Sequence, residues 1–203
     1  MKVTIVDYGA GNVPSVERAF ERLGVESQRT PSAEGIAKAE ALLLPGVGHY
    51  AALVRALDEQ NMRAALIGAI QRGVPFLGIC LGLQVLYQSS EEAPQLGGLD
   101  LLPGTVCALP SSVKLPHMGW NQVAARRSSR LLHGIESSAY FYFAHSYAVR
   151  DSHEASAATC WHGAPFAAVV EKQNIFAVQF HPEKSHRAGL QLLANFVTWD
   201  GRA

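Results

Sequence analysis

The first ninety residues alternate between two patterns of hydrophobic and polar positions. Short apolar runs typical of buried strands are separated by stretches whose apolar residues recur every three or four positions, as in helices. Strands that alternate with helices predict an α/β fold with a mostly parallel sheet covered on both faces. The expected strands are Lys2–Asp7, Ala41–Leu44 and Pro75–Ile79, and the expected helices are Pro14–Leu23, Tyr50–Gln60, Met62–Gln71 and Leu81–Ser89.

The second half of the chain has shorter apolar runs with turns between them, which predict antiparallel additions to the sheet. A helical pattern from about His186 to Trp199 closes the chain. With no repeat or low-complexity tract, we expect residues 1–203 to form a single domain. The expected late strands are Thr105–Leu109, Tyr140–Phe143, Ala155–Cys160, Phe166–Val170 and Ile175–Phe180.

The apolar run before Cys80 stops abruptly at this residue, and glycines stand two places before and two places after it. This is the pattern of a strand that turns sharply into a helix with a nucleophile at the bend. Small flanking residues let the two arms pass closely, and the first amides of the helix favour thiolate over thiol. The alternative is a buried core cysteine, the usual fate of a free thiol.

A cysteine nucleophile needs a base and a group that orients the base. His181 and Glu183 stand two residues apart, so in an extended segment their side chains point to the same side. The carboxylate could then hold the imidazole in one tautomer and stabilise its protonated form. The alternative is a histidine that caps a turn beside a solvated glutamate. An elbow cysteine in the same chain favours the catalytic interpretation.

Acyl transfer also requires donors for the oxyanion of the tetrahedral intermediate. Gly46 and Gly48 follow the expected strand Ala41–Leu44 and leave backbone amides unshielded. The amide of Leu81, directly after the cysteine, is the natural second donor. The sequence therefore predicts an oxyanion hole formed by this loop and the start of the elbow helix.

Composition excludes several classes of function. Acidic and basic residues number 17 each, so the net charge of zero gives no electrostatic case for nucleic acid or an anionic membrane. No apolar run approaches the ~20 residues that span a bilayer. Three widely spaced cysteines without a C-x-x-C pair, and eight histidines without ligand spacing, predict neither disulfides nor a metal site. The N-terminus reads as a strand instead of a secretory leader, so we expect a cytoplasmic protein.

Five segments in order resemble the class I (triad) glutamine amidotransferases, which have a flavodoxin-like, mostly parallel sheet flanked by helices. The resemblance covers nearly the whole chain and is closest to the glutaminase subunits of imidazole glycerol phosphate synthase. The most distinctive segment is Lys114–Asn121, and Pro45–Gly48 is similar to the oxyanion loop of that branch. The other segments are Asp7–Asn12 with Ser15, Tyr142–Tyr147, and Gln179–Ser185.

The resemblance implies a glutaminase that uses no cofactor. Cys80 would attack the side-chain amide of glutamine and form a γ-glutamyl thioester, His181 would move the protons, and Glu183 would orient His181. The amide of Gly48 would turn toward the oxyanion when the enzyme is switched on. The amino-acid end of glutamine would be held by Gln84 and Glu92 and by backbone groups of Ser146 and Tyr147.

The resemblance also implies a heterodimer with a (β/α)8 barrel cyclase. The cyclase would take the ammonia and make imidazole glycerol phosphate and an aminoimidazole carboxamide ribotide in histidine biosynthesis. Trp120, Tyr142 and Lys184 match residues at the docking face and gate. The alternatives are core positions for the two aromatics and a solvated charge for the lysine. By the same reasoning, His117 and His145 are interpreted as structural histidines and not as catalysts.

Two other functions are compatible with this fold. The same chemistry could serve another acceptor, as in anthranilate or pyridoxal phosphate synthesis, although Lys114–Asn121 argues against this. Alternatively, the chain could be a binding or regulatory module that kept the amidotransferase shape without catalysis. The intact Cys80, His181 and Glu183 argue against the module.

Overall fold

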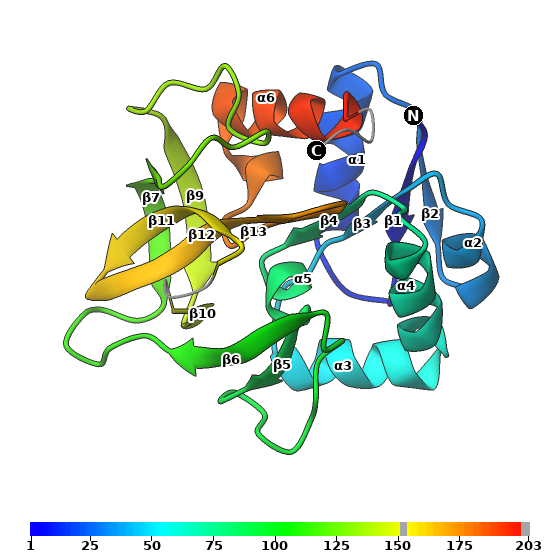
Figure 1. Cartoon of the computed structure of the whole chain (residues 1–203), viewed down its shortest axis with the longest axis horizontal. Helices are drawn as coiled ribbons and strands as arrows, with labels where there is room; N and C mark the ends of the chain where they lie inside the picture. The colour runs from blue at the N-terminus through cyan, green and yellow to red at the C-terminus, as the bar shows by residue number, and fades with distance from the viewer. Residues whose placement is uncertain (151–153, 200–203) are drawn as a thin grey trace.

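A computed structural model describes residues 1–150 and 154–199 of the chain. Its centre is an eight-stranded sheet in the order β2-β1-β3-β4-β13-β12-β11-β8 (Figure 1). Neighbouring strands run parallel from β2 to β13 and antiparallel from β13 to β8. The strands are β1 (Val3–Val6), β2 (Ser27–Thr30), β3 (Ala41–Leu44), β4 (Phe76–Ile79), β8 (Ala124–Ala125), β11 (Ser156–His162), β12 (Ala164–Lys172) and β13 (Ile175–Val178).

Helices cover both faces of this sheet (Figure 1). On one face, α1 (Val13–Arg22) and α6 (His186–Val197) bury Phe20 and Phe196 against strand residues such as Ile5. On the other face lie α2 (Ala33–Ala37), α3 (Tyr50–Glu59), α4 (Met62–Gln71) and α5 (Leu81–Gln84). The central strands are buried on both faces, and this explains their continuous apolar runs. The predicted parallel α/β architecture is therefore confirmed.

The elbow helix is much shorter than predicted. It was expected over Leu81–Ser89, but α5 ends at Gln84 and β5 (Tyr87–Ser90) follows. The carbonyl of Val85 accepts a hydrogen bond from the amide of Leu99, and the carbonyl of Leu86 accepts from the amides of Leu101 and Leu102. These carbonyls therefore bond to a later segment of the chain and not to the next turn of a helix. Such long-range pairing overrides a local helical pattern.

Two of the expected late strands do not join the main sheet. The run Thr105–Leu109 falls mostly within β6 (Leu102–Ala108), which lies between β5 and β10 (Tyr147–Val149) in a three-stranded sheet. The run Tyr140–Phe143 belongs to β9 (Tyr140–His145), which pairs with β7 (His117–Gln122) in a separate antiparallel ribbon. Both were wrongly predicted as additions to the central sheet. The expected strands Ala155–Cys160 and Phe166–Val170 do extend that sheet, as β11 and β12.

Within the described ranges, none of the helices combines the length and the apolar character that crossing a membrane requires. The carboxyl ends of β3, β4 and β13 lie next to one another because these strands are parallel neighbours. In sheets of this kind, ligands bind at such ends. Pro45–Gly48, Cys80 and His181 all follow these three strands, so the topology brings together segments that are far apart in the sequence.

Candidate active site

Cys80 occupies the sharp turn between β4 and α5 that the sequence predicts. Its φ of 54° and ψ of −105° form a backbone conformation that non-glycine residues rarely adopt. A Cβ on Gly78 would lie 2.4 Å from the carbonyl oxygen of Gly82, and a Cβ on Gly82 would lie 2.0 Å from that of Leu44. The two glycines are therefore required by close backbone packing on both arms of the elbow.

His181 and Glu183 are in direct contact: Nδ1 of His181 lies 2.9 Å from Oε1 of Glu183. Both side chains are almost fully buried. The local geometry differs from the prediction, because Glu183 lies in the short 3-10 turn η1 (Pro182–Lys184) and not in an extended segment. The turn brings the carboxylate back onto the imidazole. Asn12 supports it by donating from Nδ2 to the same Oε1 at 3.3 Å, a contact that the spacing of the residues could not reveal.

The imidazole of His181 is held in its charged form. Burial alone would lower its pKa, but hydrogen bonds and charges from Cys80 and Glu183 outweigh this and raise the pKa to about 10. Since Nδ1 faces Glu183, Nε2 is the nitrogen left to interact with the thiol. A protonated imidazole beside the sulfur is the arrangement that activates a cysteine nucleophile.

A cavity of about 270 Å³ opens over this pair. Its wall brings together nearly all of the residues predicted to form the site. Glu183 is the catalytic candidate that does not line the cavity, because it lies behind His181. The predicted residues in the wall are Gly48, Cys80, Leu81, Gln84, Glu92, Ser146, Tyr147, His181 and Lys184.

Two side chains in this wall are fixed by backbone contacts. Oε2 of Glu92 accepts a hydrogen bond of 2.8 Å from the amide of Tyr50, at the start of α3. Nε2 of Gln84 donates to the carbonyl of Tyr147 at 2.8 Å, while its Oε1 is buried without a recorded protein partner. The wall therefore presents a carboxylate and a free amide acceptor that suit an ammonium group. Gly48 also lines the cavity and has a φ of 92° that a glycine adopts without strain.

His145 also lines the cavity and was interpreted from the sequence as structural, together with His117. Nδ1 of His145 lies 2.9 Å from the carbonyl oxygen of Tyr147, so it carries the proton. Its Nε2 then accepts from Nδ1 of His117 at 3.0 Å, and Nε2 of His117 accepts from Asn121 at 3.2 Å. Burial lowers the pKa of His145 to about 3 and that of His117 to about 4. Both histidines are neutral and satisfied, in agreement with the structural interpretation.

Trp120 and Tyr142 face each other across the ribbon of β7 and β9, and their ring centroids are 5.9 Å apart. Nζ of Lys184 lies 5.7 Å from the centroid of the Tyr142 ring. The Trp120 side chain is 45% exposed, and Met118 and Tyr140 nearby are also exposed, so Trp120 is not a core residue. The main chain links this ribbon to the active site, since the amide of His181 donates to the carbonyl of Tyr142 at 2.8 Å.

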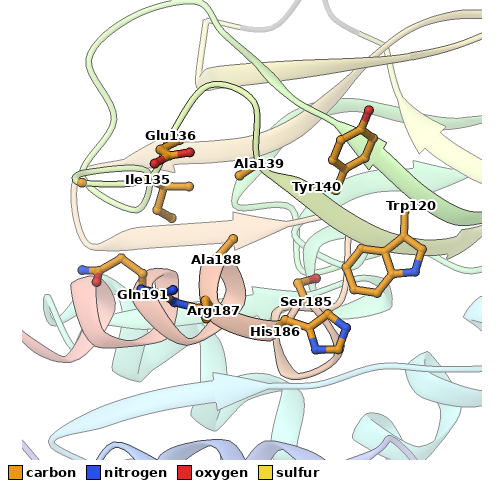
Figure 2. Close-up of a pocket in the computed structure, with 11 residues that line it drawn as sticks. Trp120, Ile135, Glu136, Ala139, Tyr140, Ser185, His186, Arg187, Ala188 and Gln191 are labelled. Carbon is orange, nitrogen blue, oxygen red and sulfur yellow. The ribbon is translucent and has the colours of Figure 1, made fainter.

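A larger hollow of about 670 Å³ lies between this ribbon and α6 (Figure 2). Trp120 stacks on His186 at its rim, with 4.9 Å between ring centroids. Among the residues that line it, none forms a nucleophile and base pair like that of Cys80 and His181. Chemistry, and not size, therefore identifies the smaller cavity as the candidate active site.

Comparison with known proteins agrees with this geometry. A family model described as glutamine amidotransferase class-I matches residues 4–199. The imidazole glycerol phosphate synthase subunit HisH of Moorella thermoacetica is 47% identical over 96% of this chain and 93% of its own length. The protein of the same name from Methanothermobacter thermautotrophicus is 46% identical over 96% of this chain and 97% of its own length.

Solved structures share the fold at much lower sequence identity. A crystal structure of a glutamine amidotransferase superposes with a TM-score of 0.76 at 19% identity, covering 96% of this chain and 98% of the other. PurLQS from Thermotoga maritima gives a TM-score of 0.74 at 18% identity, with 97% of each chain covered. The chain belongs to the class I glutamine amidotransferases and, within them, to the HisH family of imidazole glycerol phosphate synthase subunits.

Proposed function

We propose that this chain hydrolyses glutamine to glutamate and ammonia and delivers the ammonia to a cyclase subunit of imidazole glycerol phosphate synthase. The observation that carries the proposal is the buried contact of 2.9 Å between His181 and Glu183, in a chain whose His181 and Cys80 line the same cavity. Relatives named as HisH, 46% and 47% identical over nearly the full length, support the choice of synthase. They favour it over an enzyme of anthranilate or pyridoxal phosphate synthesis.

In the first half-reaction, Sγ of Cys80 attacks the side-chain carbonyl carbon of glutamine. The oxyanion accepts hydrogen bonds from the amides of Gly48 and Leu81, since the first amides of a helix have no intrahelical acceptor. The His181 imidazolium then gives its proton to the departing nitrogen, so ammonia leaves and a γ-glutamyl thioester remains. Glu183 stabilises the imidazolium before this transfer and keeps the neutral ring in one tautomer after it.

In the second half-reaction, neutral His181 takes a proton from a water molecule, which attacks the thioester. The tetrahedral intermediate collapses, the Cys80 thiolate leaves, and glutamate is released beside a regenerated imidazolium. The amino-acid end of glutamine is held by the carboxylate of Glu92, the side-chain oxygen of Gln84, and backbone groups of Ser146 and Tyr147. These groups surround the same cavity as Cys80.

The proposed partner is a (β/α)8 barrel cyclase that takes up the ammonia and forms imidazole glycerol phosphate and an aminoimidazole carboxamide ribotide. Docking would use the half-exposed Trp120 with Tyr142 and Lys184, and exposed apolar side chains at such a face are typical of an interface. The whole chain would act as one glutaminase domain. We place the enzyme in the cytoplasm because the reaction needs Cys80 as a free thiol.

The experiment compares glutamine-dependent and ammonium-dependent product formation by the complex. Cys80→Ala should abolish glutamine-dependent synthesis while the cyclase still makes product from an added ammonium salt. Loss of both activities would contradict the separation of roles. Glutamine turnover should also rise when the cyclase and an analogue of its substrate are added. Equal turnover with and without them would contradict the coupling.

A further inference from the structure

Gln179 lies beside the nucleophile, and the proposed reaction gives it no role. It follows β13, which pairs in parallel with β4 so that Val178 stands opposite Ile79. The amide of Cys80 donates to the carbonyl of Val178 at 2.8 Å, which continues this pairing past the end of both strands. Gln179 is fully buried, and its Nε2 donates to Sγ of Cys80 at 3.6 Å. The sheet register therefore sets an amide donor against the sulfur.

The orientation of this amide is fixed by a second glutamine. Nε2 of Gln84 donates to the carbonyl of Tyr147 at 2.8 Å, which settles which end of Gln84 carries the hydrogens. The same Nε2 donates to Oε1 of Gln179 at 3.1 Å. Rotating the Gln179 amide by half a turn would place two NH₂ groups against each other and a lone pair against the sulfur. The arrangement therefore requires the nitrogen of Gln179 to face Cys80.

We propose that Gln179 is a further catalytic residue, whose side-chain amide hydrogen-bonds the Cys80 thiolate and favours it over the thiol. A hydrogen bond to a charged acceptor inside a protein is stronger than one to a neutral acceptor. Unlike the imidazolium of His181, a carboxamide does not give up its proton, so it stabilises the thiolate without reprotonating it. The proposal rests on the proposed function, because it takes Cys80 as the nucleophile.

The same contacts join the nucleophile to the wall that would hold the substrate. Gln84 bonds Tyr147 on one side and Gln179 on the other, and Gln179 bonds Cys80. A substrate that engages the free oxygen of Gln84 would strengthen the same row of hydrogen bonds. Loss of the Gln179 amide is therefore expected to act on sulfur reactivity first and on glutamine binding second.

The test measures alkylation of Cys80 by iodoacetamide across pH in the full chain, with peptide mass spectrometry to assign each cysteine. Gln179→Met keeps a long side chain but has no N–H. Because the lost hydrogen bond is one to a charged acceptor, the alkylation rate on the acidic limb of the profile should fall about tenfold or more. The pH at half-maximal rate should rise by about one unit. Cys107, which is only partly buried and distant along the chain, is an internal control whose profile should not move.

A matched control variant is available at the other end of the same strand. Nδ2 of Asn174 donates to the carbonyls of Ile70 and Val74, each at 2.8 Å, and makes no contact with Cys80. Asn174→Ala should lower the free energy of unfolding and leave the Cys80 profile unchanged. Gln179→Asn, which withdraws the amide by one methylene, should behave like Gln179→Met.

A folded Gln179→Met protein with the original Cys80 profile would overturn the proposal, as would an equal shift in Asn174→Ala. Failure of both Gln179 variants to fold would also overturn it, because the amide would then be structural. The readout needs no glutamine turnover. A shifted profile in a protein without glutaminase activity would therefore reject the proposed function alone, and an unmoved profile in an active enzyme would reject only the role of Gln179.

Discussion

Replacing Glu183 by glutamine removes the charge beside His181 while the side chain keeps its size. In the native protein the pKa of His181 is about 10, compared with 6.5 for a free histidine, although burial alone would lower it. The difference of about 3.5 units corresponds to ~5 kcal/mol in favour of the imidazolium. Glu183 hydrogen-bonds this imidazolium, and a hydrogen bond to a charged group contributes roughly 1.5–3 kcal/mol, or about tenfold to a hundredfold in the proton equilibrium. Because burial opposes the rise, the true contribution is larger.

Glu183→Gln should therefore lower kcat for glutamine hydrolysis by about a hundredfold to a thousandfold. The native enzyme should keep its imidazolium as the pH rises and lose activity only as the pH approaches about 10. In the variant this alkaline limb should move down by about two units.

The assay is glutamate release between about pH 6 and 11 with the cyclase subunit present. Glu34→Gln is the matched control, since Glu34 forms an exposed ion pair with Lys38 four residues along α2. It should change kcat less than about twofold, because surface pairs contribute little. An alkaline limb that stays in place, or a loss of less than about tenfold in Glu183→Gln, would refute the reasoning.

Three further predictions follow from packing, burial and exposure. Gly82→Ala should lower the free energy of unfolding by about 1–3 kcal/mol. The control Gly68→Ala, in the middle of α4, should leave it unchanged or raise it by up to ~1 kcal/mol. Equal urea midpoints for the two variants would contradict this. The pKa of buried His117 is about 4, compared with 6.5 for a free histidine, so below pH 6.5 the unfolded chain binds more protons than the folded chain. The free energy of unfolding should therefore fall as acid is added, by ~3 kcal/mol from this group. In calorimetry, His117→Asn should show a weaker dependence of the free energy of unfolding on pH. An unchanged pH dependence would argue against a neutral buried ring. Trp120→Ala should weaken binding to the cyclase about tenfold or more in titration calorimetry, and unchanged affinity would remove Trp120 from the docking face.

The elbow and the central sheet could be predicted from the sequence because their determinants are local. Gly78 and Gly82 are required by contacts within the turn itself and with the adjacent strand, and a buried parallel strand must be apolar on both faces. For the same reason, the expected bounds of Ala41–Leu44 and Met62–Gln71 agree with β3 and α4.

The incorrect predictions concern segments whose secondary structure depends on pairing with distant parts of the chain. The polar segment Ser27–Thr30 is an edge strand, β2, whose pattern carries no apolar signal. Val85 and Leu86 leave the elbow helix because backbone amides of later residues bind their carbonyls. Neither effect can be seen in a local pattern of hydrophobic positions.

The same distinction applies to the site. The residue types of Cys80, His181 and Glu183 indicate the chemistry, but the 3-10 turn that joins the last two was not predicted. The contacts of Asn12 with Glu183 and of Gln179 with Cys80 cross 171 and 99 positions of the chain. The second contact depends on the sheet order, which sets β13 beside β4.

The central claim is that Cys80 is the nucleophile that receives the glutamyl group. The most direct measurement is covalent labelling by a glutamine analogue with an electrophilic ketone in place of the side-chain amide, followed by peptide mass spectrometry of the complex with the cyclase and its substrate analogue. The account predicts one adduct, on Cys80, that excess glutamine suppresses and that His181→Ala slows strongly. An unlabelled Cys80 under these conditions, or labelling that glutamine does not affect, would contradict it.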